Sequence, residues 1–306
     1  MIKLGFVSAI LGDLTLNEVI DFASANGYSC IEPMCWPLGK ADRRYSGVTH
    51  IDAASIDKHE AEIIKKAFKT KNVSISGLGY YPNPLHPDKE KSDFFISHIL
   101  KVIDAASLLD VGIVNTFIGA DPAKCDDDNF AKFLVIWPPI IKYAEQKNIK
   151  IGIENCPMHF TMDEWPSGNN LAHSPYLWRK MFEAIPSANF GLNYDPSHLV
   201  WQMMDYIKPV FEFKEKIFHV HIKDARINHE GLNEFGIFTP PNNIHVPKLP
   251  GLGDIDWGKF FSALYESGYK GAACVEVEDR AFEGALENRQ ASLILCRNYL
   301  RQFIAF

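Results

Sequence analysis

Residues 151–157 read IGIENCP, an apolar, strand-like run that ends on a carboxylate and then turns at a proline. Three further segments have the same form: GLNYDPSH at 191–198, HVHIKD at 219–224 and ACVEVED at 273–279. The metal-capable side chains at these strand ends are Glu154, Asp195, His221 and Glu276. Three carboxylates and one imidazole, without a thiolate, suit a divalent cation. The pattern predicts one such ion, Mn²⁺ first, with Mg²⁺, Co²⁺ or Zn²⁺ as alternatives, and metal-assisted chemistry.

Strand-like runs alternate with helical apolar spacing along the whole chain. Eight runs lie at 3–8, 28–32, 73–77, 111–115, 149–153, 190–194, 217–222 and 272–277. Helix candidates follow them, near 16–26, 56–70, 91–109, 128–147, 175–185, 202–215, 256–267 and 283–303. Apolar strands that alternate strictly with amphipathic helices indicate a parallel sheet covered by helices. Eight units predict a single α/β domain over residues 1–306, closed as a (β/α)₈ TIM barrel.

The competing architecture is an open, doubly wound parallel sheet. That fold commonly begins with a glycine-rich turn after its first strand. Here the first turn, residues 8–13, reads SAILGD, and the chain contains neither G-x-G-x-x-G nor a P-loop. The barrel is therefore favoured.

Three connections are longer than such units need, at 33–55, 155–173 and 223–255, and each follows a strand. In a barrel these loops lie on the face formed by the carboxyl ends of the strands, where active sites are built. They hold aromatic and polar side chains suited to a polyol: Trp36, Arg43, Arg44, Tyr45, His159, Trp165, Arg226, His229 and His245. We take Trp36 and Arg226 as candidate substrate-binding residues for a small-molecule sugar.

Composition restricts the partners. A formal net charge of −7 and a pI near 5.9 give no general attraction to nucleic acid or to anionic membranes. No uncharged apolar run reaches the roughly 20 residues that a membrane-spanning helix needs. The six cysteines form no C-x-x-C pair, which is typical of reduced thiols in the cytosol. We expect a cytoplasmic protein without nucleic-acid or membrane partners, and homo-oligomerisation stays open.

The segments around the four strand ends resemble the xylose isomerase-like barrels of the sugar phosphate isomerase/epimerase family. The resemblance spans essentially the whole chain and is strongest over 150–279. Its motifs are GIEN at Glu154, Asp195 followed by x-x-His198, H-x-H ending at His221, PGLGDIDW at 250–257 and the run that ends at Glu276. The resemblance implies a TIM-barrel enzyme that holds one metal ion with these strand-end side chains.

The resemblance also implies an acid/base pair. In ketose epimerases of that family, two ligand glutamates flank the substrate and exchange protons, so Glu154 and Glu276 take these roles here. A metal that binds a carbonyl and a neighbouring hydroxyl acidifies the adjacent C–H by stabilising the enediolate. The expected function is a metal-dependent isomerase or epimerase of carbohydrate metabolism, acting α to the carbonyl of a keto-sugar or cyclitol.

Residues near the ligands are candidates for substrate contact. His198 matches a position that binds a substrate oxygen in relatives. Lys223, on the same side of its strand as His221, and Asn155 are further candidates for contacting substrate or orienting a ligand. His219 faces the barrel interior one layer deeper, where we expect it to be buried.

Departures from the family pattern bear on the substrate. In characterised ketose 3-epimerases a second Glu follows the first metal Glu by six residues and an Arg follows the metal His by six. These positions are Phe160 and Ile227 here, which argues against free D-tagatose or D-psicose. The alternative function is a lyase or dehydratase on the same scaffold, either inosose dehydratase-like or eliminating a group from a keto-glycoside.

Two other functions are less favoured. Endonuclease IV-type DNA repair enzymes share the fold but need extra histidines for three zinc ions. The corresponding segments here, IEPMCW, SGLGYY and VNTFIGA, contain none. A catalytically silent sugar-binding barrel is the remaining alternative.

Overall fold

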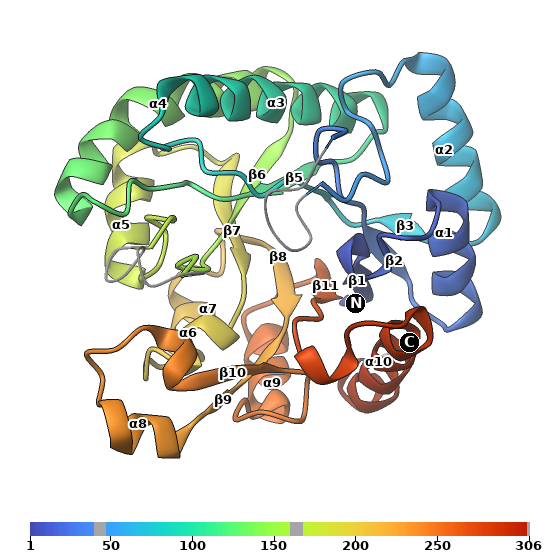
Figure 1. Cartoon of the computed structure of the whole chain (residues 1–306). Helices are drawn as coiled ribbons and strands as arrows, with labels where there is room; N and C mark the ends of the chain where they lie inside the picture. Colours follow the sequence, from blue (N-terminus) through green and yellow to red (C-terminus); the bar gives the residue numbers. More distant parts are fainter. Residues whose placement is uncertain (40–46, 160–167, 305–306) are drawn as a thin grey trace.

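The main sheet is parallel and nearly closed into a barrel (Figure 1). A computed structural model describes residues 1–39, 47–159 and 168–304, so Arg43, Arg44, Tyr45, Phe160 and Trp165 lie outside the described residues. Nine strands pair in the order β3-β2-β1-β11-β8-β7-β6-β5-β4. They are β1 Lys3–Val7, β2 Cys30–Glu32, β3 Ser74–Ile75, β4 Leu78–Gly79, β5 Ile113–Thr116, β6 Lys150–Glu154, β7 Phe190–Tyr194, β8 Ile217–Ile222 and β11 Ala272–Val275. The predicted TIM barrel is confirmed.

The barrel closes where β2 meets β3 and β4. Only residues 76–77 separate β3 from β4, and these two short strands together fill the barrel position of the predicted strand 73–77. The Ser76 N–H donates to the Ile31 carbonyl (2.8 Å) and the Gly79 N–H to the Pro33 carbonyl (3.0 Å). These bonds join the two ends of the sheet order through β2, so eight barrel positions surround one interior.

Helices cover the outside of the barrel (Figure 1). They are α1 Leu16–Ala25, α2 Lys58–Thr70, α3 Lys89–Leu108, α4 Asp126–Gln146, α5 Pro175–Ala184, α6 Ser197–Val200, α7 Lys208–Glu212, α9 Trp257–Glu266 and α10 Leu286–Leu300. Seven of the eight predicted helices agree with these bounds to within three residues. Among the described residues, no helix combines the length and the apolar character needed to cross a bilayer.

The predicted helix at 202–215 is wrong in extent, because only Lys208–Glu212 of it is α-helical. Met203 adopts a left-handed conformation (φ 57°), which ends the helical turn that began in α6. Pro209 lacks an N–H group and therefore suits the first turn of α7. The segment between the two short helices remains a loop at the rim of the barrel.

The long connection after β8 has secondary structure of its own. It forms β9 Asp224–Ile227, α8 His229–Phe235 and β10 His245–Lys248, and the two strands pair antiparallel. The Asp224 carboxylate accepts hydrogen bonds from the Gly251 and Ile255 N–H groups and from the Trp257 indole. This buried carboxylate ties the end of the connection to the start of α9.

Close approach of two strands shapes the barrel beneath the site. Between Leu192 and Asn193 the register of β7 against β8 shifts. At Gly191 a Cβ atom would lie only 2.2 Å from the Lys216 carbonyl oxygen, which is backbone and cannot move aside cheaply. The absence of a side chain at this position lets β7 and the start of β8 pack together.

We expect Gly191→Ala to destabilise the fold by about 1–3 kcal/mol, the usual cost of forcing extra volume into a packed core. Urea unfolding of the two proteins measures the difference. Gly112→Ala is the matched control, because a Cβ there meets no atom within 4 Å. Equal unfolding midpoints for both variants would show that β7 and β8 can separate without cost.

Candidate metal centre

Four side chains converge at the carboxyl ends of adjacent strands. Glu154 is the last residue of β6, Asp195 follows β7, His221 lies in β8 and Glu276 follows β11. Each offers a ligand atom, and these atoms all lie within 4.8 Å of one another. His221 Nδ1 is 3.6 Å from Glu154 Oε2 and 3.7 Å from Glu276 Oε2, so a glutamate lies on either side of it. We refer to these residues as the four-residue cluster.

The cluster contains buried polar atoms that fit a cation. Asp195 Oδ2 and His221 Nδ1 are buried and form no hydrogen bond among the described residues. Leaving such groups unsatisfied is costly, so they are suited to an ion that both can coordinate. The other Asp195 oxygen accepts from the Ser197 N–H (2.8 Å), which fixes the carboxylate. The donor set therefore fits one divalent cation.

A buried hydrogen-bond network lies behind His221. Its Nε2 is 2.8 Å from Glu32 Oε2, and Glu32 also accepts a hydrogen bond from the Tyr81 hydroxyl. Asn193 contacts His221 Nε2 (3.0 Å) and, through its carbonyl oxygen, His219 Nδ1 (2.9 Å). Glu32 and both histidines have no exposed surface. When the imidazole is neutral, as a metal ligand must be, a proton on Nε2 shared with Glu32 leaves the Nδ1 lone pair directed at the cluster.

Glu32 is the functional candidate that the sequence argument missed. It ends β2 in the segment IEP, as Glu154 ends β6 in IEN, so a carboxylate at a strand end was the available signal. Burial raises the pKa of the Glu32 carboxyl, but His221 and His219 outweigh burial and lower it. Burial alone would lower the pKa of His221, but Glu32 and the cluster glutamates outweigh burial and raise it well above its ordinary value. The pair is therefore held together by charge.

Lys223 places an ammonium group among the carboxylates. Its Nζ lies 2.6 Å from Glu276 Oε2, 3.0 Å from Glu278 Oε2 and 3.2 Å from Asp195 Oδ2. The side chain is almost fully buried. Burial lowers the pKa of Lys223, but the surrounding carboxylates raise it more, so the group is charged.

The two glutamates of the cluster differ in protonation. Burial raises the pKa of Glu154, but the nearby His198 and His221 imidazoles and the Lys223 ammonium outweigh this and lower it. Burial raises the pKa of Glu276 to about 8, although Lys223 opposes the shift. The two carboxyls therefore differ in proton affinity in the metal-free protein, which suits opposite roles in proton transfer.

The remaining candidates lie at different distances from the cluster. His198 Nε2 is 3.4 Å from Glu154 Oε1 and 3.3 Å from Asp195 Oδ2, so it borders the cluster directly. Asn155 is fully buried, and its amide bonds the backbone N–H (2.7 Å) and carbonyl (2.8 Å) of Asp195. This geometry suits orienting a ligand residue rather than touching substrate.

Trp36 and Arg226 lie further out. Trp36 is half-buried and meets Tyr80 edge to face at 5.0 Å, in the apolar group that also contains Tyr81. Arg226 is an exposed residue of β9, opposite Val246 of β10, and is not part of the buried cluster. Substrate binding by Trp36 and Arg226 stays a prediction.

The chain belongs to the xylose isomerase-like TIM barrel family, whose pattern matches residues 20–298. It is 28% identical over 300 residues to the uncharacterized protein YfiH of Bacillus subtilis, covering 90% of this chain and 93% of that protein. It is 31% identical over 137 residues to inosose dehydratase of Geobacillus thermodenitrificans, covering 44% of this chain and 45% of that enzyme.

Solved structures show the same fold. The IolI protein with a binding zinc atom superposes with a TM-score of 0.72 at 17% identity, and each chain is covered in full. D-allulose 3-epimerase from Methylomonas sp. superposes with a TM-score of 0.68 at 16% identity over 99% of this chain and 98% of that one. The match over residues 20–298 confirms the predicted family, and the solved structures with the same fold include a protein with a bound zinc atom and an epimerase.

Glu32→Gln is expected to weaken divalent-metal binding by about 10–100-fold, the usual cost of losing the partner of a ligand histidine. A glutamine can offer its N–H₂ group to His221 Nε2, which favours the tautomer with its proton on Nδ1 and blocks the ligand lone pair. Calorimetric titration with Mn²⁺ measures the affinity, and Glu266→Gln, exposed on α9, is the control. An unchanged Mn²⁺ affinity would contradict a role for Glu32 in setting the tautomer.

Proposed function

We propose that this protein is a divalent-metal-dependent carbohydrate isomerase or epimerase, which moves a proton next to the carbonyl of a keto-sugar or cyclitol. The observation that carries the proposal is the pair of glutamates near His221 Nδ1, at 3.6 and 3.7 Å. Each has two oxygens, so each can coordinate an ion through one and carry a proton on the other, as an acid/base pair requires.

Glu154, Asp195, His221 and Glu276 would hold the ion, for which Mn²⁺ is our first choice and Mg²⁺, Co²⁺ or Zn²⁺ the alternatives. When bound, a divalent ion polarises the substrate carbonyl and so acidifies the neighbouring C–H bond. The zinc atom bound by IolI, a protein of the same fold, supports a divalent metal in this protein.

Glu154, the ionised carboxylate, removes the proton from the carbon beside the carbonyl. The C–H electron pair becomes a C=C bond, and the carbonyl oxygen takes the negative charge. Glu276 then returns a proton to the same carbon from the other face, the carbonyl re-forms, and the product is the epimer. If the proton goes instead to the former carbonyl carbon, the proton of the neighbouring hydroxyl moves to the former carbonyl oxygen, the neighbouring C–O becomes the new carbonyl, and the product is the isomer. The next turnover runs with the two roles exchanged or after solvent has restored both protonation states.

His198 and Lys223 would bind substrate oxygens. The His198 Nε2 lies within 3.4 Å of Glu154 and Asp195 oxygens, so an oxygen bound near the cluster is within its reach. Lys223 adds a positive charge beside Glu276, where negative charge on a substrate oxygen would be stabilised.

Glu154→Gln and Glu276→Gln are each expected to lower proton exchange by 10²–10⁴-fold, the usual contribution of a general acid or base. NMR in D₂O on a panel of keto-sugars and inososes measures deuterium incorporation, and elemental analysis shows whether each variant keeps its metal. Glu183→Gln, exposed on α5, is the control. Metal-loaded variants that exchange at the original rate would rule out catalysis by these carboxylates.

A dehydratase is the second candidate, favoured by Lys223 and by the partial similarity to inosose dehydratase. After Glu154 takes the proton, the carbonyl re-forms and a C=C bond forms between the deprotonated carbon and its neighbour on the side away from the carbonyl. The C–O bond on that neighbour breaks, and its electron pair leaves with the oxygen. Lys223 supplies the proton that turns the leaving hydroxyl into water. The first step is shared with the isomerase, so only the fate of the enediolate differs.

Lys223→Met separates the two candidates. For a dehydratase we expect deuterium exchange to continue while loss of water falls by at least about 100-fold, because the acid for the leaving group is gone. For an isomerase no water is lost by either protein. NMR of the products after metal saturation distinguishes these results, with Lys142→Met, exposed on α4, as the control.

A further inference from the structure

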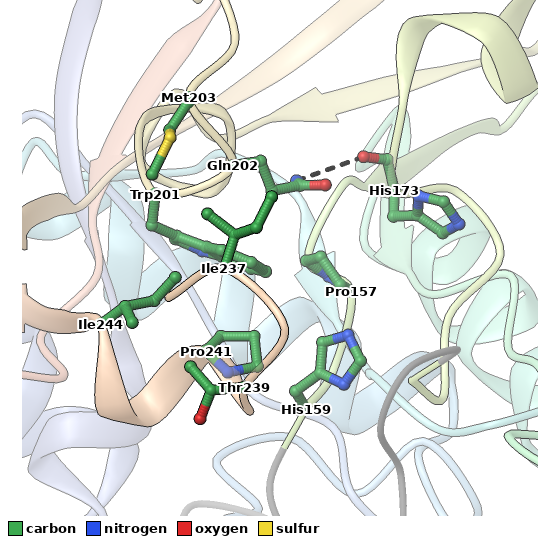
Figure 2. A pocket seen from close by; sticks show the side chains of 10 residues that line it. All are labelled: Pro157, His159, His173, Trp201, Gln202, Met203, Ile237, Thr239, Pro241 and Ile244. Atoms are coloured by element: carbon green, nitrogen blue, oxygen red, sulfur yellow. Dashed lines mark hydrogen bonds between the residues drawn. The ribbon is translucent and has the colours of Figure 1, made fainter. Parts of the chain in front are cut away.

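A pocket of about 330 Å³ opens among the loops that follow three of the ligand-bearing strands (Figure 2). Pro157 and His159 follow β6, Trp201 and Gln202 follow α6, and Ile237 belongs to the connection after β8. We propose that this pocket is a subsite for an aryl group joined to the carbohydrate substrate. The proposal deepens the proposed function and rests on it.

One imidazole connects the pocket to the four-residue cluster. His198 Nε2 lies 3.4 Å from Glu154 Oε1, while its Nδ1 accepts a hydrogen bond from the Trp201 indole N–H at 3.4 Å. A sugar whose reacting carbon lies at the cluster would therefore extend a neighbouring substituent past His198 toward Trp201. The position of the pocket suits a group attached to the sugar rather than a separate ligand.

The pocket presents a rigid aromatic surface. Trp201 stacks on His245 with ring centroids 4.9 Å apart and an interplanar angle of 19°. Burial lowers the pKa of His245 to about 4, so this backing ring is uncharged at neutral pH. In Figure 2 the Trp201 indole lies between Ile244 on one side and Pro157 on the other, with Ile237 close by. A flat, apolar occupant matches such a lining.

Three polar side chains of the lining bond other groups of the protein. The Gln202 N–H₂ group donates to the carbonyls of His198 (2.6 Å) and His173 (3.3 Å). The His173 ring faces Asp126 (3.4 Å), and the Thr239 hydroxyl oxygen accepts from Asn243 (2.7 Å). A second sugar ring would need several hydrogen-bond partners, which these groups offer poorly. An aryl ring needs none.

The size of the pocket agrees with this occupant. A cavity of about 150 Å³ with an apolar lining is large enough for benzene. The 330 Å³ found here has room for one substituted ring or two fused rings. Ile237 and Met203, both more than half exposed, give the opening an apolar rim through which such a group can extend.

The test compares phenyl β-D-glucopyranoside with methyl β-D-glucopyranoside on the Mn²⁺-loaded full chain, by calorimetry and saturation-transfer NMR. The two probes share the sugar, so the difference in affinity isolates the aryl group. We expect the phenyl glycoside to bind about 10-fold more tightly, the value of one aromatic contact. Trp201→Ala should remove most of that difference, and because both probes meet His198 through the same sugar, loss of its hydrogen bond from Trp201 changes both affinities alike.

Two further variants keep the result interpretable. Ile237→Asp places a charge in the lining at an exposed position, so it should remove the phenyl preference without disturbing the core. Tyr176→Ala, an exposed aromatic of α5, should leave the preference intact. Phenyl and methyl glycosides that bind equally, or a phenyl preference that survives both pocket variants, would overturn the proposal.

Failure of the proposed function gives a different result. Deuterium exchange on unsubstituted keto-sugars reports on the cluster alone, independently of aryl binding. Exchange without a phenyl preference refutes the subsite and leaves the proposed function standing. A phenyl preference that the pocket variants remove, together with no exchange on any keto-sugar, supports the subsite and refutes the catalytic proposal.

Discussion

The hydrogen bonds that join β2 to β3 and β4 close the parallel sheet, and the candidate site exists because of that closure. In a closed parallel barrel all strands end on one rim, so side chains far apart in sequence meet in a single ring. Closure also brings Glu32, at the end of β2, against His221 on β8 across the interior. An open sheet would leave these two strands on a surface without a shared centre.

Burial of charge is the second constraint, and it explains the composition of the ring. Glu32, Glu154 and Asp195 are carboxylates with almost no exposed surface. A buried carboxylate is unfavourable unless a positive group or a hydrogen-bond donor compensates it. The His221 imidazole compensates the charge of Glu32, and the Lys223 ammonium compensates the charge of the cluster carboxylates. A divalent cation would add positive charge where these carboxylates are most crowded.

Sequence periodicity predicted most of the fold because each strand and helix carries its own local signal. The alternation of apolar strands with amphipathic helices was sufficient for the barrel and for seven helices. It failed at 202–215, where a left-handed Met203 interrupts an otherwise helical apolar pattern. It also gave no sign of the β9–β10 hairpin, since antiparallel pairing there depends on residues about 20 positions apart in a connection without strict alternation.

The sequence by itself determined which residue types end the strands, and therefore that Glu154, Asp195, His221 and Glu276 are candidate ligands. Only the tertiary structure decided what surrounds them. Glu32 behind His221 and the aromatic pocket at Trp201 result from segments more than 40 residues apart meeting at one rim. Local patterns report on contacts along one element, whereas the orientation of an imidazole or the shape of a pocket depends on how distant elements pack.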